Sequence, residues 1–520
     1  MNKFQAGCQK NRSTADNIFL LRGCTDHHIY YGKSLYLTLY DVKQCFDKLW
    51  LSDCLVSLWD IGIKDEMFHL MYKMNEKAEV TVKSPFTECK PFTATKLVMQ
   101  GKVLGPTFCS VSTAEYCTEN SEAGVQVGTL KVGLLVFVDD VIDISDNLAQ
   151  VITSHEHAKS FTNRKRLQSS TKAKCKVLII NKQVTDSIPE LEINGEILPI
   201  VSFANYLGDI FNTAGNNEDM IDDRVRKGTG SIQEIFALAL EITYGVEYVT
   251  SLLLLYHTTF LPSLIFNSEA WTNLSQSDLR KLQSLQLKFL KKIVQAPRCT
   301  ASSFIFMEFG VLPIRQEIDQ RKLMFLHHVL SLQDDDPVKR MYNILKDMPG
   351  KKNWAKECYI IRELYRITNK DEDIQKMKRE TWKNIVKSKI QDYAISVLTE
   401  EKETKKKVRQ IEHKCLEPQL YLKSLKKKNA STLFKIRSQV LEIKANERYL
   451  HQDMSCRLCD APEEDLTHVL QCKEVTKENE KCETFGCEIF FQDIDNFNIA
   501  IVKEHLEVVE KFLDEVQKRN

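Results

Sequence analysis

The chain has 520 residues, of which 43% are apolar and 28% are charged. This balance is typical of a folded globular protein and excludes a disordered or fibrous chain. The 72 Lys and Arg residues nearly cancel the 71 Asp and Glu residues, which excludes a chain-wide polycation but leaves local binding of nucleic acid open. The low numbers of glycines (18) and prolines (12) favour helices over long flexible linkers.

Cysteine usage and hydropathy indicate an intracellular protein. The 16 cysteines make up about 3% of the chain, far less than in disulfide-rich secreted domains. Residues 1–20 lack the apolar core of a signal peptide, and the most apolar stretch, residues 252–266, is broken by His257 and Pro262 and is too short to span a bilayer. We therefore expect a reducing nuclear or cytoplasmic setting, no membrane contact, and cysteines that lie mostly in the core.

Residues 1–182 are predicted to be mixed α/β. Short apolar runs in this region have the length and composition of strands, and helical or polar stretches separate them. A turn is predicted at Asn194-Gly195, between two further strand-like pieces. The predicted strands of the first region cover residues 34–40, 78–82, 130–138 and 177–180.

Helices are predicted to dominate from about residue 218 onward. Residues 275–295 place apolar side chains on one helical face, with Lys and Arg elsewhere, and residues 317–332 behave similarly. The second half of the chain should therefore be built mainly from packed helices.

Charge is distributed unevenly over these helices. Residues 351–428 hold 22 basic against 12 acidic residues, whereas residues 451–520 hold 8 against 17. The basic runs, which include Lys405–Lys407 and Lys426–Lys428, are either solvated helix faces or a surface that binds phosphate groups.

Two apolar runs are each followed by acidic residues. The run that ends at Val138 leads into Asp139 and Asp140, and an apolar alternation then resumes, which predicts a hairpin with two acids at its tip. Neighbouring carboxylates that lose water repel each other and favour a divalent cation, although acids are also common in turns that face water. The run 34–40 is followed by Asp41, and two such strands side by side would hold Mg²⁺ for phosphoryl transfer.

Several motifs carry a family resemblance. Asp41 followed by Phe46-Asp47, and about a hundred residues later Phe137-Val-Asp-Asp140, resembles the palm of reverse transcriptases. Further segments, in the same order, resemble the enzymes of non-LTR (LINE-type) retrotransposons. These segments are Gln5-Ala-Gly-Cys8 with Arg12-Ser-Thr-Ala-Asp16, Gln100-Gly-Lys-Val-Leu-Gly-Pro106, Lys174-Cys-Lys176, Phe203-Ala-Asn-Tyr-Leu-Gly208 and the helical stretch 312–330.

The resemblance implies a role for four charged residues. Asp41 and Asp139, with Asp140 assisting, would bind two Mg²⁺ ions, which would activate a primer 3′-hydroxyl for attack on an incoming nucleotide. Lys174 would neutralise or protonate the leaving pyrophosphate; an ordinary surface lysine is the alternative.

The resemblance also implies a nucleotide pocket. Phe46 would lie under the sugar and exclude a ribose 2′-hydroxyl, with a plain core phenylalanine as the alternative. Gln100 and Gly101 would line the pocket, where glycine lets the backbone approach the substrate closely.

The chain departs from the family pattern at several points. Val138 stands where the family more often has alanine, and Cys8 replaces the usual phenylalanine. The family's enzymes carry further fingers segments upstream and an endonuclease, so this chain is expected to be a truncated element.

A cysteine- and histidine-rich cluster follows near the end of the chain. Cys456, Cys459, His468 and Cys472 form the pattern C-x₂-C-x₈-H-x₃-C, which suits one structural, tetrahedral Zn²⁺. A chance grouping, with the histidine at a helix cap, is the alternative. Similar Cys-Cys-His-Cys knuckles follow the thumb in several non-LTR reverse transcriptases. The acidic residues 463–465 favour a contact with protein or RNA bases over a nonspecific grip on phosphates.

The expected fold is α+β, a right-hand polymerase palm with partial fingers, followed by a mostly helical thumb and C-terminal region. The expected function is that of an RNA-directed DNA polymerase from a non-LTR retrotransposon, acting on an RNA template, a DNA primer and deoxynucleoside triphosphates. A catalytically inactive retrotransposon-derived remnant that binds RNA or a partner is the alternative. The expected parts are 1–182 (partial fingers and palm), 183–300 (primer grip and thumb), 301–450 (basic helical extension) and 451–520 (zinc knuckle and acidic tail).

Overall fold

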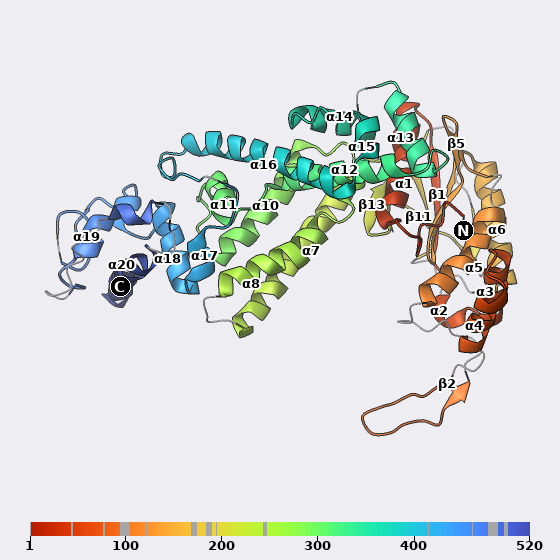
Figure 1. Cartoon of the computed structure of the whole chain (residues 1–520), viewed down its shortest axis with the longest axis horizontal. Coiled ribbons are helices and arrows are strands. Elements are labelled where there is room, and N and C mark those ends of the chain that lie inside the picture. Colours follow the sequence, from red (N-terminus) through yellow and green to blue (C-terminus); the bar gives the residue numbers. More distant parts are fainter. Residues whose placement is uncertain are drawn as a thin grey trace.

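A computed structural model shows an elongated molecule with a sheet-containing region at one end and helices along the rest of its length (Figure 1). The N-terminus lies in the sheet region, and the C-terminal helices lie at the opposite end. The structure describes residues 2–42, 45–75, 79–93, 104–119, 123–167, 174–183, 190–193, 195–242, 247–350, 352–413, 415–459, 461–476, 487–492, 494 and 498–519.

A five-stranded sheet with the strand order β11-β8-β1-β7-β6 forms the centre of the N-terminal region. β1 is antiparallel to both β7 and β8, β6 is antiparallel to β7, and β11 runs parallel to β8. The central strand β1 is buried along its whole length, as its continuous apolar run predicts. The bounds are β1 (Leu35–Tyr40), β6 (Leu134–Phe137), β7 (Asp140–Ser145), β8 (Lys176–Ile180) and β11 (Ile200–Val201).

Helices cover both faces of this sheet. Alternate residues of β1 point to opposite faces and so belong to two different hydrophobic cores. Leu37 and Leu39 share a hydrophobic core with Phe19 of α1, whereas Tyr36 and Tyr40 share a second core with α3, α5 and α6. The N-terminal helices are α1 (Thr14–Tyr30), α2 (Cys45–Lys48), α3 (Leu51–Asp60), α4 (Asp65–Asn75), α5 (Gly105–Glu119) and α6 (Leu148–Arg164).

Four small hairpins surround the sheet, and two of them test the sequence predictions. The predicted strand 130–138 is wrong as a single element: it breaks at Gly133 into β5, which pairs with β4, and β6, which joins the main sheet. The predicted turn at 194–195 is confirmed by the pairing of β9 with β10, where Gly195 has a φ of 77°; Asn194 lies outside the described residues. The hairpins are β2 (Glu79–Val80) with β3 (Phe92–Thr93), β4 (Val125–Val127) with β5 (Leu130–Val132), β9 (Glu192–Ile193) with β10 (Glu196–Ile197), and β12 (Phe203–Tyr206) with β13 (Asp209–Asn212).

Helices make up most of the chain after β13, as predicted. The predicted helix 275–295 is α10, which starts with a capping box between Ser275 and Asp278. The predicted helix 317–332 is confirmed by α12, which ends at Ser331, with Leu332 as its C-cap. None of the described helices has the length and apolar character needed to cross a membrane. The first helices of this part are α7 (Glu218–Ile242), α8 (Tyr248–Leu255), the π-helix η1 (Tyr256–Phe260), α9 (Leu261–Leu264), η2 (Ser268–Ala270), α10 (Gln276–Ile293), α11 (Ser302–Phe309) and α12 (Ile314–Ser331).

The remaining helices extend the molecule away from the sheet. In Figure 1, α16 lies along the helical middle of the molecule, where it packs on α11 and α12. At the far end, α20 packs against α18 and α19. These elements are α13 (Pro337–Asp347), α14 (Trp354–Leu364), α15 (Asp371–Lys376), α16 (Arg379–Glu403), α17 (Leu420–Ser424), α18 (Lys427–Arg437), η3 (Lys444–Asn446), α19 (Leu466–Gln471), η4 (Cys487–Phe490) and α20 (Ile499–Arg519).

A buried aspartate joins the sheet region to the helices that follow it. Asp209, the first residue of β13, has an exposed fraction of 0%. Its Oδ1 accepts a hydrogen bond from Arg224 of α7 at 2.9 Å, and its Oδ2 accepts from Trp271 Nε1 at 2.9 Å. Arg22 of α1 lies 3.4 Å from Oδ2. One carboxylate therefore holds α1, the β12–β13 hairpin and α7 together.

A second buried carboxylate joins the helical middle to the C-terminal part. Glu308 of α11 accepts hydrogen bonds from Arg437 of α18 (Nε at 3.0 Å, Nη2 at 2.9 Å) and from His413 and Tyr421. Arg437 also donates to the carbonyl of Phe490 in η4. Burial raises the pKa of Glu308, but the charge of Arg437 and the two other donors outweigh burial and lower the pKa to about 2.

Replacing this carboxylate tests the second junction. In Glu308→Gln we expect the free energy of unfolding near pH 7 to fall by about 3–5 kcal/mol, because Arg437 stays buried without a counter-charge. The folded-state pKa of Glu308 lies below its ordinary value of 4.5, so its stabilisation is present above that value and is lost as the pH falls towards 2. The difference between parent and variant should therefore be large near pH 7 and smaller near pH 3.

Urea unfolding at the two pH values measures this difference. Glu403→Gln, an equivalent change at an exposed position of α16, serves as the control and should change stability by less than about 0.5 kcal/mol. A difference that does not depend on pH would contradict the assigned role of the Glu308 charge.

Candidate active site and metal cluster

Three acidic side chains meet at one end of the central strands. Asp41 directly follows β1, whereas Asp139 and Asp140 lie at the turn between β6 and β7. The antiparallel register of β1 and β7 places Asp41 opposite Asp140. Lys174, just before β8, donates from Nζ to both carboxylate oxygens of Asp41, at 3.1 and 3.2 Å. The structure thus brings together the four charged residues that the sequence analysis singled out.

The acids of this cluster repel one another electrostatically, and Asp41 and Asp139 are half-buried. Burial raises the pKa of Asp139, and the charge of Asp41 raises it further. The pKa of Asp140 is raised to about 6 by burial and by the charges of Asp139 and Asp41, against the opposing effect of Lys174. Half-buried carboxylates that repel one another are hard oxygen ligands, and they fit a divalent cation such as Mg²⁺.

The turn that carries Asp139 has an unusual backbone. Phe137 pairs with Asp140, so Val138 and Asp139 are the two central residues of a tight hairpin turn. Val138 has a φ of 62°, whereas Asp139 is not among the residues with positive φ. This is the pattern of a type II′ turn, which normally has glycine at the first position. A β-branched residue in this conformation stores about 1–3 kcal/mol of strain.

The predicted nucleotide-pocket residues are only partly described. Phe46, on α2, is half-buried and packs against the core that contains Phe108 and Tyr116. Gln100 and Gly101 lie outside the described residues. The sequence analysis assigned no role to Gln5 or Thr113, although both side chains form hydrogen bonds to Val138. Gln5 lies in one of the motifs that carry the family resemblance, and this motif could have pointed to it. Thr113 lies inside an apolar helix, where no feature of the sequence points to a role.

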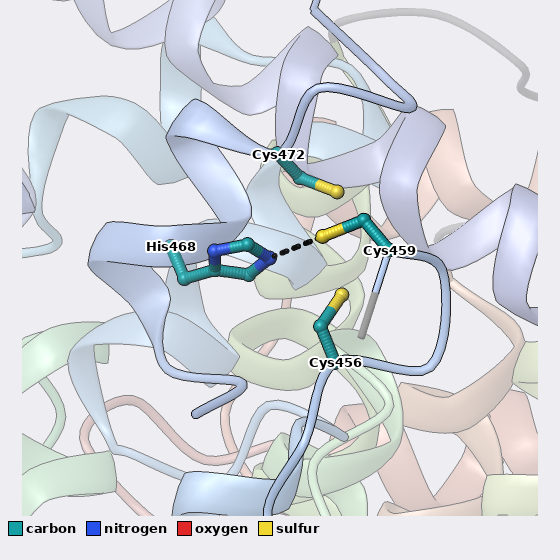
Figure 2. Close-up of side chains that lie close together, drawn as sticks. All are labelled: Cys456, Cys459, His468 and Cys472. Carbon is teal, nitrogen blue, oxygen red and sulfur yellow. Dashed lines mark hydrogen bonds between the residues drawn. The ribbon is translucent and has the colours of Figure 1, made fainter. Parts of the chain in front are cut away.

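The Cys and His residues predicted as metal ligands come together (Figure 2). Cys456, Cys459, His468 and Cys472 point toward one another, and one ligand atom of each lies within 4.8 Å of all the others. The Sγ of Cys459 lies 3.4 Å from Nε2 of His468. Bonds of about 2.0–2.3 Å to a central tetrahedral ion place ligand atoms at about this separation, so the cluster can hold a metal ion.

The acidic residues beside this cluster support its local structure. Asp465 accepts a hydrogen bond from the backbone N–H of His468 and so caps α19. Glu464 is fully buried and bonds both the side chain and the backbone N–H of Arg457, within the loop between the first two cysteines. Glu463 pairs with Arg448. Each of these three acidic residues therefore has a partner within the protein.

The two lysine clusters differ in their surroundings. Lys405–Lys407 are exposed, although Lys407 also donates to backbone carbonyls of Gln439 and Asn446. Lys428 pairs with the acidic helix α20, 3.0 Å from Asp514, and Lys427 lies over a tyrosine ring. The acidic tail thus neutralises part of the second cluster. Five further basic residues are exposed on or beside the first half of α16: Lys378, Arg379, Lys383, Lys387 and Lys389.

Comparison with known proteins identifies the region that holds the carboxylates. Residues 1–208 match the family model described as "Reverse transcriptase (RNA-dependent DNA polymerase)". This region is therefore similar to reverse transcriptases. A five-stranded sheet with helices on both faces is followed by a mostly helical region, so the expected α+β class is confirmed.

Individual relatives are distant. The "RNA-directed DNA polymerase from mobile element jockey" of Drosophila funebris is 23% identical over 315 residues, which are 57% of this chain and 32% of that protein. The chain thus spans about a third of the length of this curated relative. Among solved structures, telomerase from Candida albicans with a fragment of telomeric RNA has a TM-score of 0.34 and 11% identity, over 72% of this chain and 54% of that one. Apo telomerase from Candida tropicalis has a TM-score of 0.32 and 14% identity, over 71% and 56%.

We expect the mutual repulsion of the three carboxylates to lower stability when no divalent ion is bound. In the absence of divalent ions, Asp139→Asn should raise the melting temperature by a few degrees, about 1 kcal/mol, because it removes one of the repelling, half-buried charges. The same variant should lose most of the rise in melting temperature that Mg²⁺ or Mn²⁺ produces in the parent.

Thermal unfolding with and without millimolar divalent ion measures both effects. Asp60→Asn, at an exposed position at the end of α3, removes the same charge far from the cluster and should behave like the parent. The metal assignment is wrong if divalent ions stabilise Asp139→Asn as much as the parent.

Proposed function

We propose that this chain is an RNA-directed DNA polymerase of the non-LTR retrotransposon type, which adds deoxynucleotides to a primer 3′-hydroxyl on an RNA template. The observation that supports this most directly is the meeting of Asp41, Asp139 and Asp140 at the end of β1 and the β6–β7 turn. This cluster lies inside the region that matches the reverse transcriptase family. The similarity to the jockey polymerase supports the non-LTR assignment.

In this proposal the carboxylates hold two Mg²⁺ ions, with Asp41 and Asp139 as the main ligands and Asp140 assisting. When bound, the ions stabilise the attacking and leaving oxygens of the transferred phosphate. Lys174, which bonds Asp41, provides a positive charge on the same side of the sheet. It is therefore well placed to neutralise or protonate the pyrophosphate that leaves.

In this proposal the other parts of the chain bind the incoming nucleotide, the primer and the template. Phe46, Gln100 and Gly101 would contact the incoming nucleotide. Residues 1–182 would act as palm and partial fingers, 183–300 as primer grip and thumb, and 301–450 as a basic extension. The exposed cations along α16 would neutralise phosphates of the template or primer.

We further propose that the cluster at Cys456, Cys459, His468 and Cys472 is a structural zinc knuckle. Burial raises the pKa of Cys456, and the neighbouring thiolate of Cys459 raises it further, so three thiolates at this place require a cation. Zn²⁺ would supply that charge and lock α19 to the loop 456–459. Because such a site needs reduced thiols, we place the protein inside the cell, in the nucleus or the cytoplasm.

Primer extension tests the polymerase directly. The parent chain, given an RNA template, an annealed DNA primer, deoxynucleotides and Mg²⁺, should extend the primer. Asp139→Ala should reduce extension at least about 1,000-fold, because loss of metal ligation removes several kcal/mol of transition-state stabilisation. Asp60→Ala is the matched control and should retain the parent's rate.

A well-folded parent that does not extend any primer would contradict the proposed activity. If that parent still binds RNA in a salt-dependent way, equally well with Asp41→Ala and Asp139→Ala, the chain is an inactive RNA-binding protein instead.

Metal analysis tests the zinc knuckle. The purified full chain should contain one zinc ion, and Cys459→Ser should lose it together with the stability of the C-terminal part. Cys487→Ser is the matched control, because Cys487 lies near α19, 3.5 Å from Thr467, but outside the cluster. Zinc-free parent protein with unchanged circular dichroism and melting would exclude a structural zinc ion.

A further inference from the structure

We propose that Gln5 is a positioning residue that holds the Val138–Asp139 turn in the conformation that keeps Asp139 in the carboxylate cluster. The consequence for metal binding rests on the proposed function, whereas the effect on the turn does not. The proposal concerns a residue far from the cluster in sequence, 133 positions before Val138.

The side-chain amide of Gln5 forms hydrogen bonds with both the N–H and the carbonyl of Val138. Its Oε1 accepts a hydrogen bond from the N–H of Val138 at 3.0 Å, and its Nε2 donates to the carbonyl of the same residue at 3.3 Å. Oε1 also accepts from the N–H of Gly7 at 2.9 Å, and Nε2 also donates to Oγ1 of Thr113 at 2.9 Å. All four hydrogen-bonding positions of a primary amide are therefore used.

The partners fix the orientation of this amide. Two backbone N–H groups can only donate, so the atom that faces them must be the oxygen. Gln5 has an exposed fraction of 0%, and leaving its polar atoms unpaired there would be costly. Thr113 adds a second grip, because its hydroxyl donates to the carbonyl of Val138 at 2.7 Å.

The segment that carries Gln5 cannot easily move away from the turn. Its neighbours extend β6 by a short parallel bridge, in which Ala6 N–H bonds the carbonyl of Val136 at 3.0 Å and Val136 N–H bonds the carbonyl of Phe4 at 2.9 Å. The backbone of Gln5 is therefore anchored beside Val136 at the edge of the same sheet. From there its side chain reaches Val138, two residues after Val136.

Gly7 completes the cradle around the turn. A Cβ at this position would lie 2.5 Å from the backbone N of Val138 and 2.7 Å from its Cγ2. Real Cβ atoms do not approach other atoms so closely, so the backbone at Gly7 lies against Val138 only because glycine has no side chain. The Gln-x-Gly pattern at Gln5 and Gly7 thus has one physical explanation, which is close contact with this turn.

The hydrogen bonds from Gln5 are important for the turn because the backbone of Val138 is strained. The left-handed φ of Val138 suits glycine and not a β-branched residue, so an isolated turn would relax. Relaxation would rotate the peptide that leads into Asp139 and move its carboxylate away from Asp41. Gln5 opposes this because it accepts from the N–H of Val138 and donates to the carbonyl of the same residue while Val138 is in the left-handed conformation.

Hydrogen exchange tests the effect on the turn without any metal. In Gln5→Met, which keeps the length of the side chain but removes its hydrogen bonds, peptides covering the β6–β7 turn should exchange at least about tenfold faster than in the parent. Gln286→Met is the matched control, because Gln286 is equally buried, donates to Tyr256 and Leu312, and belongs to α10. Unchanged exchange at the turn in Gln5→Met would overturn the proposal.

Mn²⁺ binding, followed by electron paramagnetic resonance, tests the effect on the carboxylates. Gln5→Met should weaken binding by roughly 10- to 100-fold, as loss of a residue that orients ligands typically does. Val138→Gly relieves the strain, so the double variant should bind Mn²⁺ within about threefold of Val138→Gly alone. If Gln5→Met weakens binding equally in both backgrounds, Gln5 acts through general stability and the proposal fails.

Two further outcomes are informative. If Gln5→Met does not fold, Thr113→Val replaces it. This variant removes one donor to Val138 and one acceptor of Gln5 Nε2, and it should cause a smaller loss that Val138→Gly again rescues. If the parent binds no Mn²⁺ at all, the proposed polymerase function fails, and hydrogen exchange alone decides the role of Gln5.

Discussion

The buried carboxylate of Asp209 is the contact that joins the sheet region to the first helices that follow it. A charge that is fully removed from water is tolerated only with opposite charges and hydrogen bonds around it, and here two arginines and a tryptophan supply them. These partners come from α1, α7 and the segment after η2, so one side chain holds the β12–β13 hairpin, α1 and the first long helix of the helical region together. Glu308 and Arg437 repeat this arrangement between α11 and α18.

At the candidate active site, in contrast, carboxylates of like charge lie near one another. Asp41 and Asp139 are half-buried and Asp140 is exposed, with Lys174 as their nearby cation, and Val138 beside them is held in a strained conformation. Such a site costs stability when no metal ion is bound, and the protein offsets this cost through its surroundings. Rigid strands on either side of the turn and the hydrogen bonds from Gln5 and Thr113 keep the acids in place.

The acidic residues near the C-terminal Cys/His cluster have structural partners. Asp465 caps α19, Glu464 bonds Arg457, and Asp514 of α20 pairs with Lys428 of α18. These acidic side chains therefore form contacts within the protein. The basic residues on or beside the first half of α16 are exposed, and one of them, Lys383, pairs with Glu380.

The sequence by itself was enough to predict the acidic residues at the ends of the strands, the Cys and His residues that come together, the buried strand β1 and the helices α10 and α12, because each depends on residue type and local spacing. It placed one strand over 130–138 where the structure breaks the run at Gly133, since alternation does not show which partner each half will pair with. Only the tertiary structure decided that Gln5 and Thr113 hold Val138, and that Asp209 and Glu308 join distant segments. Those contacts connect residues far apart in the chain, and their geometry exists only after the backbone has folded.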